Sequence, residues 1–262
     1  MQTFEASTIP QGDVRKVLLI GPEGTGKTHF IGTCPKPIAI CSFDGGYRTL
    51  AGMPGVTVFA FADENRASPK AWMEFRGQLD KILKGEVKCN GEVYKTIAID
   101  SLTALSKYIF DHEQAVNNTT DKPAGFTPYT NTKSKLQDVV IKGVMSNAVL
   151  VCTAVIQADK DDLTGEIFMT PSTEGKFREE AGQWFDVVGF TSVAKDVATG
   201  KPKFLMDLIG DTRRKAKIRM SGIHVGGLNA VEDPSFDKLL KIANYKQPTD
   251  KENTNAQTNS KP

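Results

Sequence analysis

An eight-residue run near the N-terminus constrains the fold of this 262-residue chain more than any other feature. Residues 21–28 read GPEGTGKT and match the pattern G-x-x-x-x-G-K-[ST]. They follow the apolar run 17–20 and precede residues 29–32, which we expect to be helical. Glycines let successive backbone N–H groups wrap an anion, and the N-terminus of a helix attracts negative charge. The run, here called the phosphate loop, therefore predicts a phosphate-binding turn between a strand and a helix.

Two side chains of the phosphate loop have an expected chemical role. Lys27 would reach the β- and γ-phosphates of a nucleoside triphosphate, and the Thr28 hydroxyl would ligate Mg²⁺. ATP and Mg²⁺ are therefore the expected cofactors, and the residues do not separate ATP from GTP. The residues expected to bind the nucleotide are Gly21, Pro22, Glu23, Gly24, Thr25, Gly26, Lys27 and Thr28.

Two aspartates end predicted strands, where a nucleotide site needs carboxylates. Asp100 ends the apolar run 96–100 and would complete the magnesium shell together with Thr28. Asp44 follows the run 37–43 and precedes two glycines, so it is the candidate to orient or deprotonate an attacking water. A simple turn-capping role for Asp44 is the alternative, and Glu23 is a weaker candidate for the catalytic carboxylate.

Strands and helices alternate along the chain. The predicted strands cover residues 14–20, 37–43, 56–61, 94–100 and 148–156, and the predicted helices cover residues 68–83, 133–146 and 176–184. Asn90-Gly91 predicts a tight hairpin turn whose second arm runs into 94–100. The alternation predicts an α/β fold with a mostly parallel sheet flanked by helices. The β-rich runs between residues 186 and 219 predict antiparallel strands added at the C-terminal edge.

Composition and the chain ends set further limits. Lys plus Arg is 33 and Asp plus Glu is 31, so any basic site must be local. The four cysteines form no CxxC pair, which favours reduced thiols in the cytoplasm. No apolar run approaches the roughly 20 residues that span a bilayer, so no membrane partner is expected. Residues 1–13 are predicted to be a flexible arm and 245–262 a disordered polar tail, on either side of one domain, 14–244.

Several of these segments together resemble the RecA-type ATPases. The finer pattern resembles phage RecA-like ATPases that act as single-strand annealing or recombination proteins. The matching segments are the phosphate loop, TIAIDSLTAL at 96–105, Asp44-Gly45-Gly46, Thr153-Ala154 and Gly175-Lys176. The resemblance covers roughly residues 14–225. The resemblance implies a RecA-like core that hydrolyses ATP, binds single-stranded DNA, and forms a ring or filament. It also implies a single-strand-binding protein as a further partner. If the protein is encoded by a phage, it would act in the cytoplasm of the host.

The resemblance also implies roles for individual residues. Asp44 takes the position of the catalytic carboxylate, and Asp100 that of the metal-shell aspartate. In such proteins the strand after the metal aspartate usually ends in a polar sensor of the γ-phosphate. Here the aligned residue is Val155. Either Gln157, two residues later, takes over this role or the sensor is missing.

A basic segment follows the predicted sheet, reading RRKAKIRM at 213–220. In a strand, Arg213, Lys215, Lys217 and Arg219 would share one face, because the side-chain period is two. Lys217 and Arg219 resemble the trans-acting basic pair of RecA- and DnaB-type oligomers, which reaches the γ-phosphate bound by a neighbouring subunit. A solvated edge strand and a patch for the DNA backbone are the alternatives.

By the same resemblance, two loops would meet DNA. Residues 115–127 are polar, and Phe126 with the nearby Tyr129 could stack on bases or simply anchor the loop. Residues 157–172 are acidic and are better explained as a hairpin that turns at Thr164-Gly165. A helicase-loader or motor ATPase is the alternative function. A small-molecule kinase is a weaker one, because the sequence has no clear arginine-bearing lid.

Overall fold

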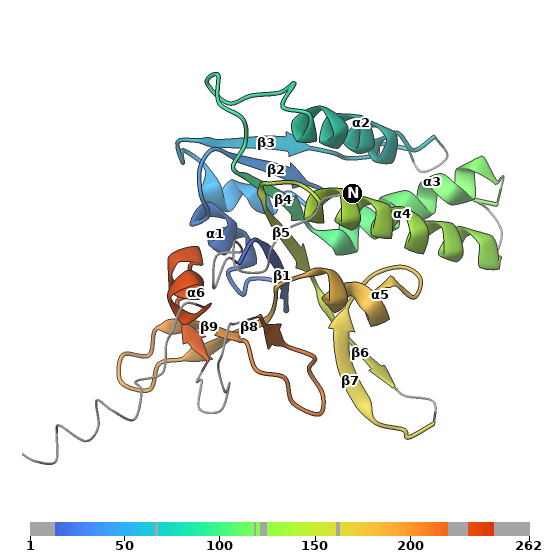
Figure 1. The fold of residues 1–262 in the computed structure, drawn as a ribbon. Coiled ribbons are helices and arrows are strands. Elements are labelled where there is room, and N and C mark those ends of the chain that lie inside the picture. The colour runs from blue at the N-terminus through green and yellow to red at the C-terminus, as the bar shows by residue number, and fades with distance from the viewer. Residues whose placement is uncertain are drawn as a thin grey trace, which may run out of the picture.

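The computed structural model shows a central β-sheet with helices on both faces (Figure 1). It describes residues 14–65, 68–117, 119–120, 125–160, 163–219 and 230–243. The predicted arm at 1–13 and tail at 245–262 lie outside the described residues, so the domain boundaries stay predictions. None of the helices in the described ranges is long and apolar enough to cross a membrane.

The core of the sheet is parallel, as the alternation of elements predicts. Its strands are β1 (Lys16–Ile20), β2 (Ile38–Ser42), β3 (Val56–Ala60), β4 (Thr96–Asp100), β5 (Val149–Ala154) and β8 (Val187–Lys195), in the order β8-β1-β5-β4-β2-β3. Strands β1, β2, β4 and β5 are buried along their whole length. Continuous apolar runs form such strands because helices cover both faces of a parallel sheet.

Antiparallel strands extend the sheet beyond β8, which confirms the predicted mixed edge. They are β9 (Pro202–Asp207), β10 (Lys217–Ile218) and β11 (Val231–Glu232); β9 and β10 pair with β8, and β11 pairs with β9. A separate hairpin of β6 (Ile156–Lys160) and β7 (Ile167–Pro171) projects from the end of β5 (Figure 1). It reverses direction around Gly165, whose φ of 73° suits glycine, as the sequence predicts.

Helices cover the two faces of the sheet unequally. One face packs against α2 (Ala71–Leu83), α3 (Leu102–Val116), α4 (Phe126–Val144), α5 (Phe177–Glu180) and the short helix η3 (Ala181–Trp184). The other face packs against α1 (Lys27–Gly32), η2 (Gly46–Leu50) and α6 (Phe236–Ala243). In Figure 1, α1 and α6 lie on one side of the strands and α2, α3 and α4 on the other. Each buried aliphatic or aromatic side chain of these helices contributes about 1.5–3 kcal/mol.

Some predicted elements differ in extent. Helix α4 begins at Phe126 rather than Lys133, and the predicted helix 176–184 is divided into α5 and η3. The Asn90-Gly91 turn forms with positive φ at both residues, but its arms share only an isolated bridge between Cys89 and Glu92. The tight turn at Asn90-Gly91 is therefore confirmed, whereas the two residue runs that flank it do not pair as hairpin strands.

The cysteines of the chain are free thiols. Cys34, Cys41 and Cys152 are buried, and Cys89 is half-buried. Burial raises the pKa of Cys41 to about 12 and raises those of Cys34 and Cys152 as well. These three thiols therefore act as small apolar side chains of the core.

Candidate nucleotide-binding site

The phosphate loop joins the buried strand β1 directly to helix α1. Gly24 and Gly26 adopt positive φ values of 73° and 83°, and Gly26 is the N-cap of α1. A Cβ on Gly21 would lie 2.2 Å from the Thr191 hydroxyl oxygen and 2.5 Å from the Thr191 carbonyl oxygen. Only glycine fits at Gly21, because the start of the phosphate loop packs closely against β8.

A threonine pair fixes the phosphate loop to the neighbouring strand β8. The Thr25 and Thr191 hydroxyl oxygens lie 2.7 Å apart in a buried hydrogen bond, and the Thr25 hydroxyl also donates to the Pro22 carbonyl oxygen at 2.8 Å. Thr191 is 166 residues away from Thr25 in the sequence. Sequence reasoning missed Thr191 because no local pattern marks a contact across that distance.

The Lys27 ammonium group is held against the phosphate loop itself. Its Nζ donates to the carbonyl oxygens of Gly21 at 2.8 Å and Pro22 at 2.6 Å. Burial lowers the pKa of Lys27, and the carboxylates of Asp100, Asp44 and Glu23 oppose that shift. A partly desolvated cation beside backbone N–H groups is a favourable position for phosphate oxygens.

Asp100 is held by hydroxyl groups on both oxygens and is only 3% exposed. Its Oδ2 accepts a hydrogen bond of 2.8 Å from Thr28 and its Oδ1 one of 2.5 Å from Thr153. Burial raises the pKa of Asp100, Asp44 raises it further, and the hydrogen bonds from Thr153 and Thr28 together with Lys27 oppose the rise. The structure therefore brings Thr28 and Asp100 together as the sequence predicts.

The oxygen atoms of Thr28 and Asp100 are hard ligands that fit Mg²⁺. Within the described ranges, no group of three or more His, Cys, Asp or Glu side chains could hold a metal ion. Thr28 and Asp100 would therefore supply the protein's share of the ligands to Mg²⁺, and water and phosphate oxygens would supply the rest.

Asp44 lies beside the same pair of residues. Its Oδ1 accepts a hydrogen bond of 3.1 Å from the Gly46 N–H, so the turn-capping alternative is realised. A Cβ on Gly46 would lie 3.2 Å from both Asp44 Oδ1 and Thr28 Oγ1, and 3.6 Å from Asp100 Oδ2. The three oxygen atoms thus surround one small space. Asp44 is exposed, and so is Glu23, the weaker candidate for the catalytic carboxylate.

The two residues considered for the γ-phosphate sensor, Val155 and Gln157, follow β5, whose last residue Ala154 accepts a hydrogen bond of 3.2 Å from the Gly21 N–H of the phosphate loop. The Val155 N–H donates to the Thr103 hydroxyl oxygen at 2.9 Å, so Val155 links β5 to helix α3. Gln157 donates its side-chain amide to Asp159 Oδ1 at 3.1 Å within the projecting hairpin. The contacts of Gln157 are therefore those of a hairpin residue.

The basic segment is not the four-residue cationic face that alternation predicts, because only Lys217 and Ile218 are paired as a strand. Arg214 pairs with Asp207 and Asp211. The Arg219 guanidinium donates to Asp186 Oδ1 at 3.2 Å and to the Gln183 carbonyl oxygen at 3.1 Å. Ser221-Gly222, which follow this segment, lie outside the described residues.

Lys217 and Arg219 also lie away from the phosphate loop of their own chain. Lys217 lines a cavity against α5 and η3, on the sheet face opposite α1. Arg219 faces Asp186 and Gln183, beside η3. Their role toward a neighbouring subunit therefore stays a prediction.

The fold and this site define a P-loop nucleotide-binding domain: a parallel sheet, a glycine-rich loop ahead of a helix, and a buried aspartate against the loop threonine. The family described as "AAA domain" matches residues 13–220. The chain therefore belongs to the AAA domain family. A comparison with curated proteins gives no match.

Solved structures with a related arrangement come from distant proteins. A KaiC-like protein, PH0186, from the archaeon Pyrococcus horikoshii OT3 has 13% identity and a TM-score of 0.37, covering 75% of this chain and 78% of the other. A prototypical ATPase from the type III secretion system of pathogenic bacteria has 12% identity and a TM-score of 0.43, covering 68% of this chain and 52% of the other. The chain thus spans about half of that second protein.

Proposed function

We propose that the protein binds ATP with Mg²⁺, hydrolyses it, and acts as a RecA-like assembly on single-stranded DNA in recombination or strand annealing. The observation that carries the ATPase part is the convergence of Thr28, Asp100 and Asp44 around Gly46, next to Lys27. These groups supply a cation, two metal ligands and a candidate base at one loop. The DNA part is supported by the resemblance of the motifs and by an exposed aromatic ring at the start of α4.

Each group of the site has a defined task in this proposal. The backbone N–H groups of the phosphate loop and the Lys27 ammonium bind the β- and γ-phosphates. Thr28 and Asp100 would hold Mg²⁺, which neutralises phosphate charge when bound. Asp44 orients the attacking water and accepts its proton at a carboxylate oxygen, because it is the exposed carboxylate next to the metal ligands.

Thr153 offers a test of how Asp100 is held. Thr153→Val keeps the side-chain volume but removes the hydrogen bond to Oδ1, which favours the charged form of Asp100. The pKa of Asp100 should therefore rise further, and the acidic limb of the ATPase pH profile should move to higher pH. We expect the Mg²⁺ concentration for half-maximal activity to rise about tenfold, equivalent to the loss of about 1.4 kcal/mol.

Steady-state ATPase assays across pH and Mg²⁺ concentration measure both effects. Thr153→Ser should restore them, because serine keeps the hydroxyl donor. Thr170→Val is the matched control, since Thr170 donates to Asp159 in the projecting hairpin rather than to the site. A Thr153→Val protein with the pH profile and the Mg²⁺ requirement of the wild type would show that Thr153 does not position Asp100.

One aromatic ring stands out as a candidate for DNA contact. Phe126, the first residue of α4, is 85% exposed. Tyr129 packs on Phe110 with ring centroids 4.7 Å apart and therefore serves as an anchor. In the projecting hairpin, the Asp159 carboxylate is paired with Arg178 at 2.8 Å, which reduces its repulsion toward phosphate. Phe126 is thus the ring most available to stack on an unpaired base.

The DNA proposal is tested by two assays on the full chain. We expect single-stranded DNA to raise ATP turnover and the protein to accelerate annealing of complementary strands. Phe126→Ala should weaken DNA binding about tenfold, because one stacked base contributes roughly 1–3 kcal/mol. Val197→Ala, at a fully exposed apolar residue of the β8–β9 connection, is the control. If the protein does not bind single-stranded DNA, the proposed action on DNA is wrong. Strand displacement without annealing would favour a motor ATPase.

A further inference from the structure

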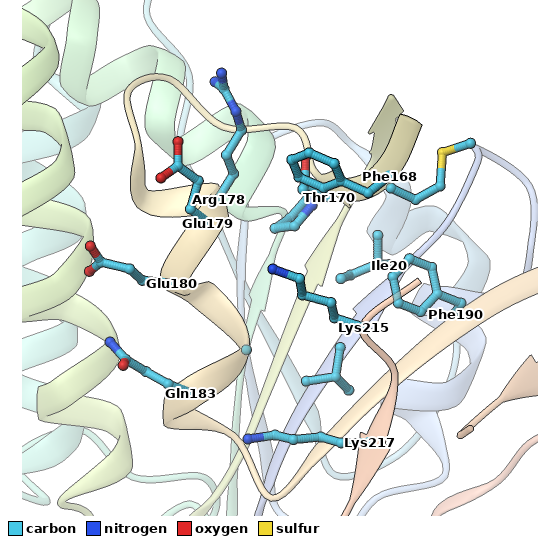
Figure 2. A pocket seen from close by; sticks show the side chains of 14 residues that line it. Ile20, Phe168, Thr170, Arg178, Glu179, Glu180, Gln183, Phe190, Lys215 and Lys217 are labelled. Carbon is cyan, nitrogen blue, oxygen red and sulfur yellow. The ribbon is translucent and has the colours of Figure 1, made fainter. Parts of the chain in front are cut away.

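A cavity of about 320 Å³ lies on the sheet face opposite α1 and is separate from the phosphate loop. Its floor is apolar and is formed by Ile20 of β1 with Val188 and Phe190 of β8. Phe168 and Met169 of β7 close one side. Figure 2 shows that α5 and η3 form the facing wall. A volume of this size is at the lower end of the range for small-molecule sites, roughly 300–1,000 Å³.

Two lysines supply positive charge to this apolar space. Lys215 and Lys217 are two residues apart, and Figure 2 shows both side chains extending toward the wall that carries Glu180 and Gln183. The Lys215 Nζ lies 5.6 Å from the centroid of the Phe168 ring. Among the described residues, Lys217 Nζ has neither an ion-pair nor a hydrogen-bond partner. Burial and the nearby Arg219 lower the pKa of Lys217, and the Asp186 carboxylate opposes that shift. An anion bound beside the Lys217 ammonium group would stabilise its charged form.

Several of the other charges around the cavity are already engaged, and Glu179, which also lines it, is exposed. Arg178 pairs with Asp159 at 2.8 Å, and Glu180 pairs with Lys133 at 2.6 Å. Arg219 is held by Asp186. Lys215 and Lys217 are therefore the cations left to meet a ligand. The Gln183 side chain adds an amide on the facing wall that can donate or accept a hydrogen bond.

We propose that this cavity binds a small organic phosphate that carries a flat ring system, as a nucleoside monophosphate does. The phosphate lies between Lys215 and Lys217, because two ammonium groups match its double negative charge. The ring lies against Phe190 of the floor and Phe168 of the side, where burial of apolar surface and aromatic contact both favour it. A free nucleotide and the terminal nucleotide of a DNA strand present the same chemistry.

Calorimetric titration of the full chain with dTMP and AMP tests this proposal. We expect saturable binding that Lys217→Gln and Lys215→Gln each weaken at least tenfold. Lys201→Gln, at an exposed lysine of the β8–β9 connection, should leave the affinity unchanged. The Lys27→Ala protein should also bind with unchanged affinity, because Lys27 belongs to the phosphate loop on the opposite face. Circular dichroism confirms that each variant is folded, and the exposed Lys215 provides a test even if Lys217→Gln fails to fold.

The ligands themselves separate the contributions. Inorganic phosphate and thymidine should each bind at least tenfold more weakly than dTMP, because phosphate lacks the ring system and thymidine lacks the phosphate group. Binding of a 5′-phosphorylated dT8 strand with the same lysine dependence would support a strand end as the source, and tighter binding of dTMP would support the free nucleotide. Lys217→Gln and Lys215→Gln proteins that both keep wild-type affinity would overturn the proposal. So would equal binding of phosphate and dTMP, or no binding of any nucleotide.

Discussion

Replacing Lys27 with alanine should reduce ATP turnover on the order of a hundredfold or more, because the substitution removes the cation beside the β- and γ-phosphates. The loop backbone should survive, since the Lys27 side chain contacts it only through the carbonyl oxygens of Gly21 and Pro22. Lys81→Ala, at an exposed lysine of α2, is the control for loss of a positive charge. A coupled phosphate-release assay measures the change. Full activity in the Lys27→Ala protein would reject the assignment of the phosphate loop.

The same variant tests whether subunits share a site. If Arg219 acts in trans on the neighbour's nucleotide, Lys27→Ala subunits still provide Arg219, and Arg219→Ala subunits still provide an intact phosphate loop. Mixtures of the two should therefore regain part of the activity that each lacks alone. Parallel mixtures with Lys217→Ala test the other member of the predicted pair. No recovery at any ratio, with assembly confirmed by light scattering, would exclude the shared site.

Asp44→Asn should preserve ATP affinity while lowering turnover about 10²–10⁴-fold, the usual contribution of a positioned general base. Asparagine keeps an oxygen that can accept the Gly46 N–H, so the turn after β2 should hold its shape. Equilibrium binding and single-turnover hydrolysis separate the two effects. Glu23→Gln is the comparison, because Glu23 is an exposed carboxylate in the phosphate loop itself. Normal turnover in Asp44→Asn together with loss in Glu23→Gln would move the catalytic role to Glu23.

The parallel core and most of the site could be predicted because their signals are local. Continuous apolar runs specify strands buried on both faces, and the glycine pattern of the phosphate loop is specific to phosphate-binding turns. Asp44 and Asp100 follow such runs, and carboxyl ends of parallel strands meet at one edge of a sheet. Their proximity to Thr28 therefore followed from the sequence pattern.

The features that escaped prediction depend on long-range contacts. Thr153 of β5 donates a hydrogen bond to Asp100, which is 53 residues away in the sequence. Thr191 of β8 is hydrogen-bonded to Thr25 of the phosphate loop, which is 166 residues away. The basic segment looks like one cationic face, but Asp186 and Asp207, brought in by folding, pair with Arg219 and Arg214. Side-chain alternation alone cannot show which charges will find partners.

Helix α4 shows a local error of a different kind. Pro128 suggests a loop by its residue type, yet it lies in the first turn of the helix. The first N–H groups of a helix have no partner within it, so a proline costs little there. The helix therefore begins seven residues earlier than the apolar spacing predicts, and it places Phe126 at its exposed start.

The most direct test of the account is the binding of ATP to the full chain by calorimetry, with and without Mg²⁺. We predict one site of micromolar or tighter affinity that weakens when Mg²⁺ is withdrawn and is lost in the Lys27→Ala protein. If no purine triphosphate binds in the presence of Mg²⁺, or if Lys27→Ala binds as well as the wild type, the proposed nucleotide site is wrong.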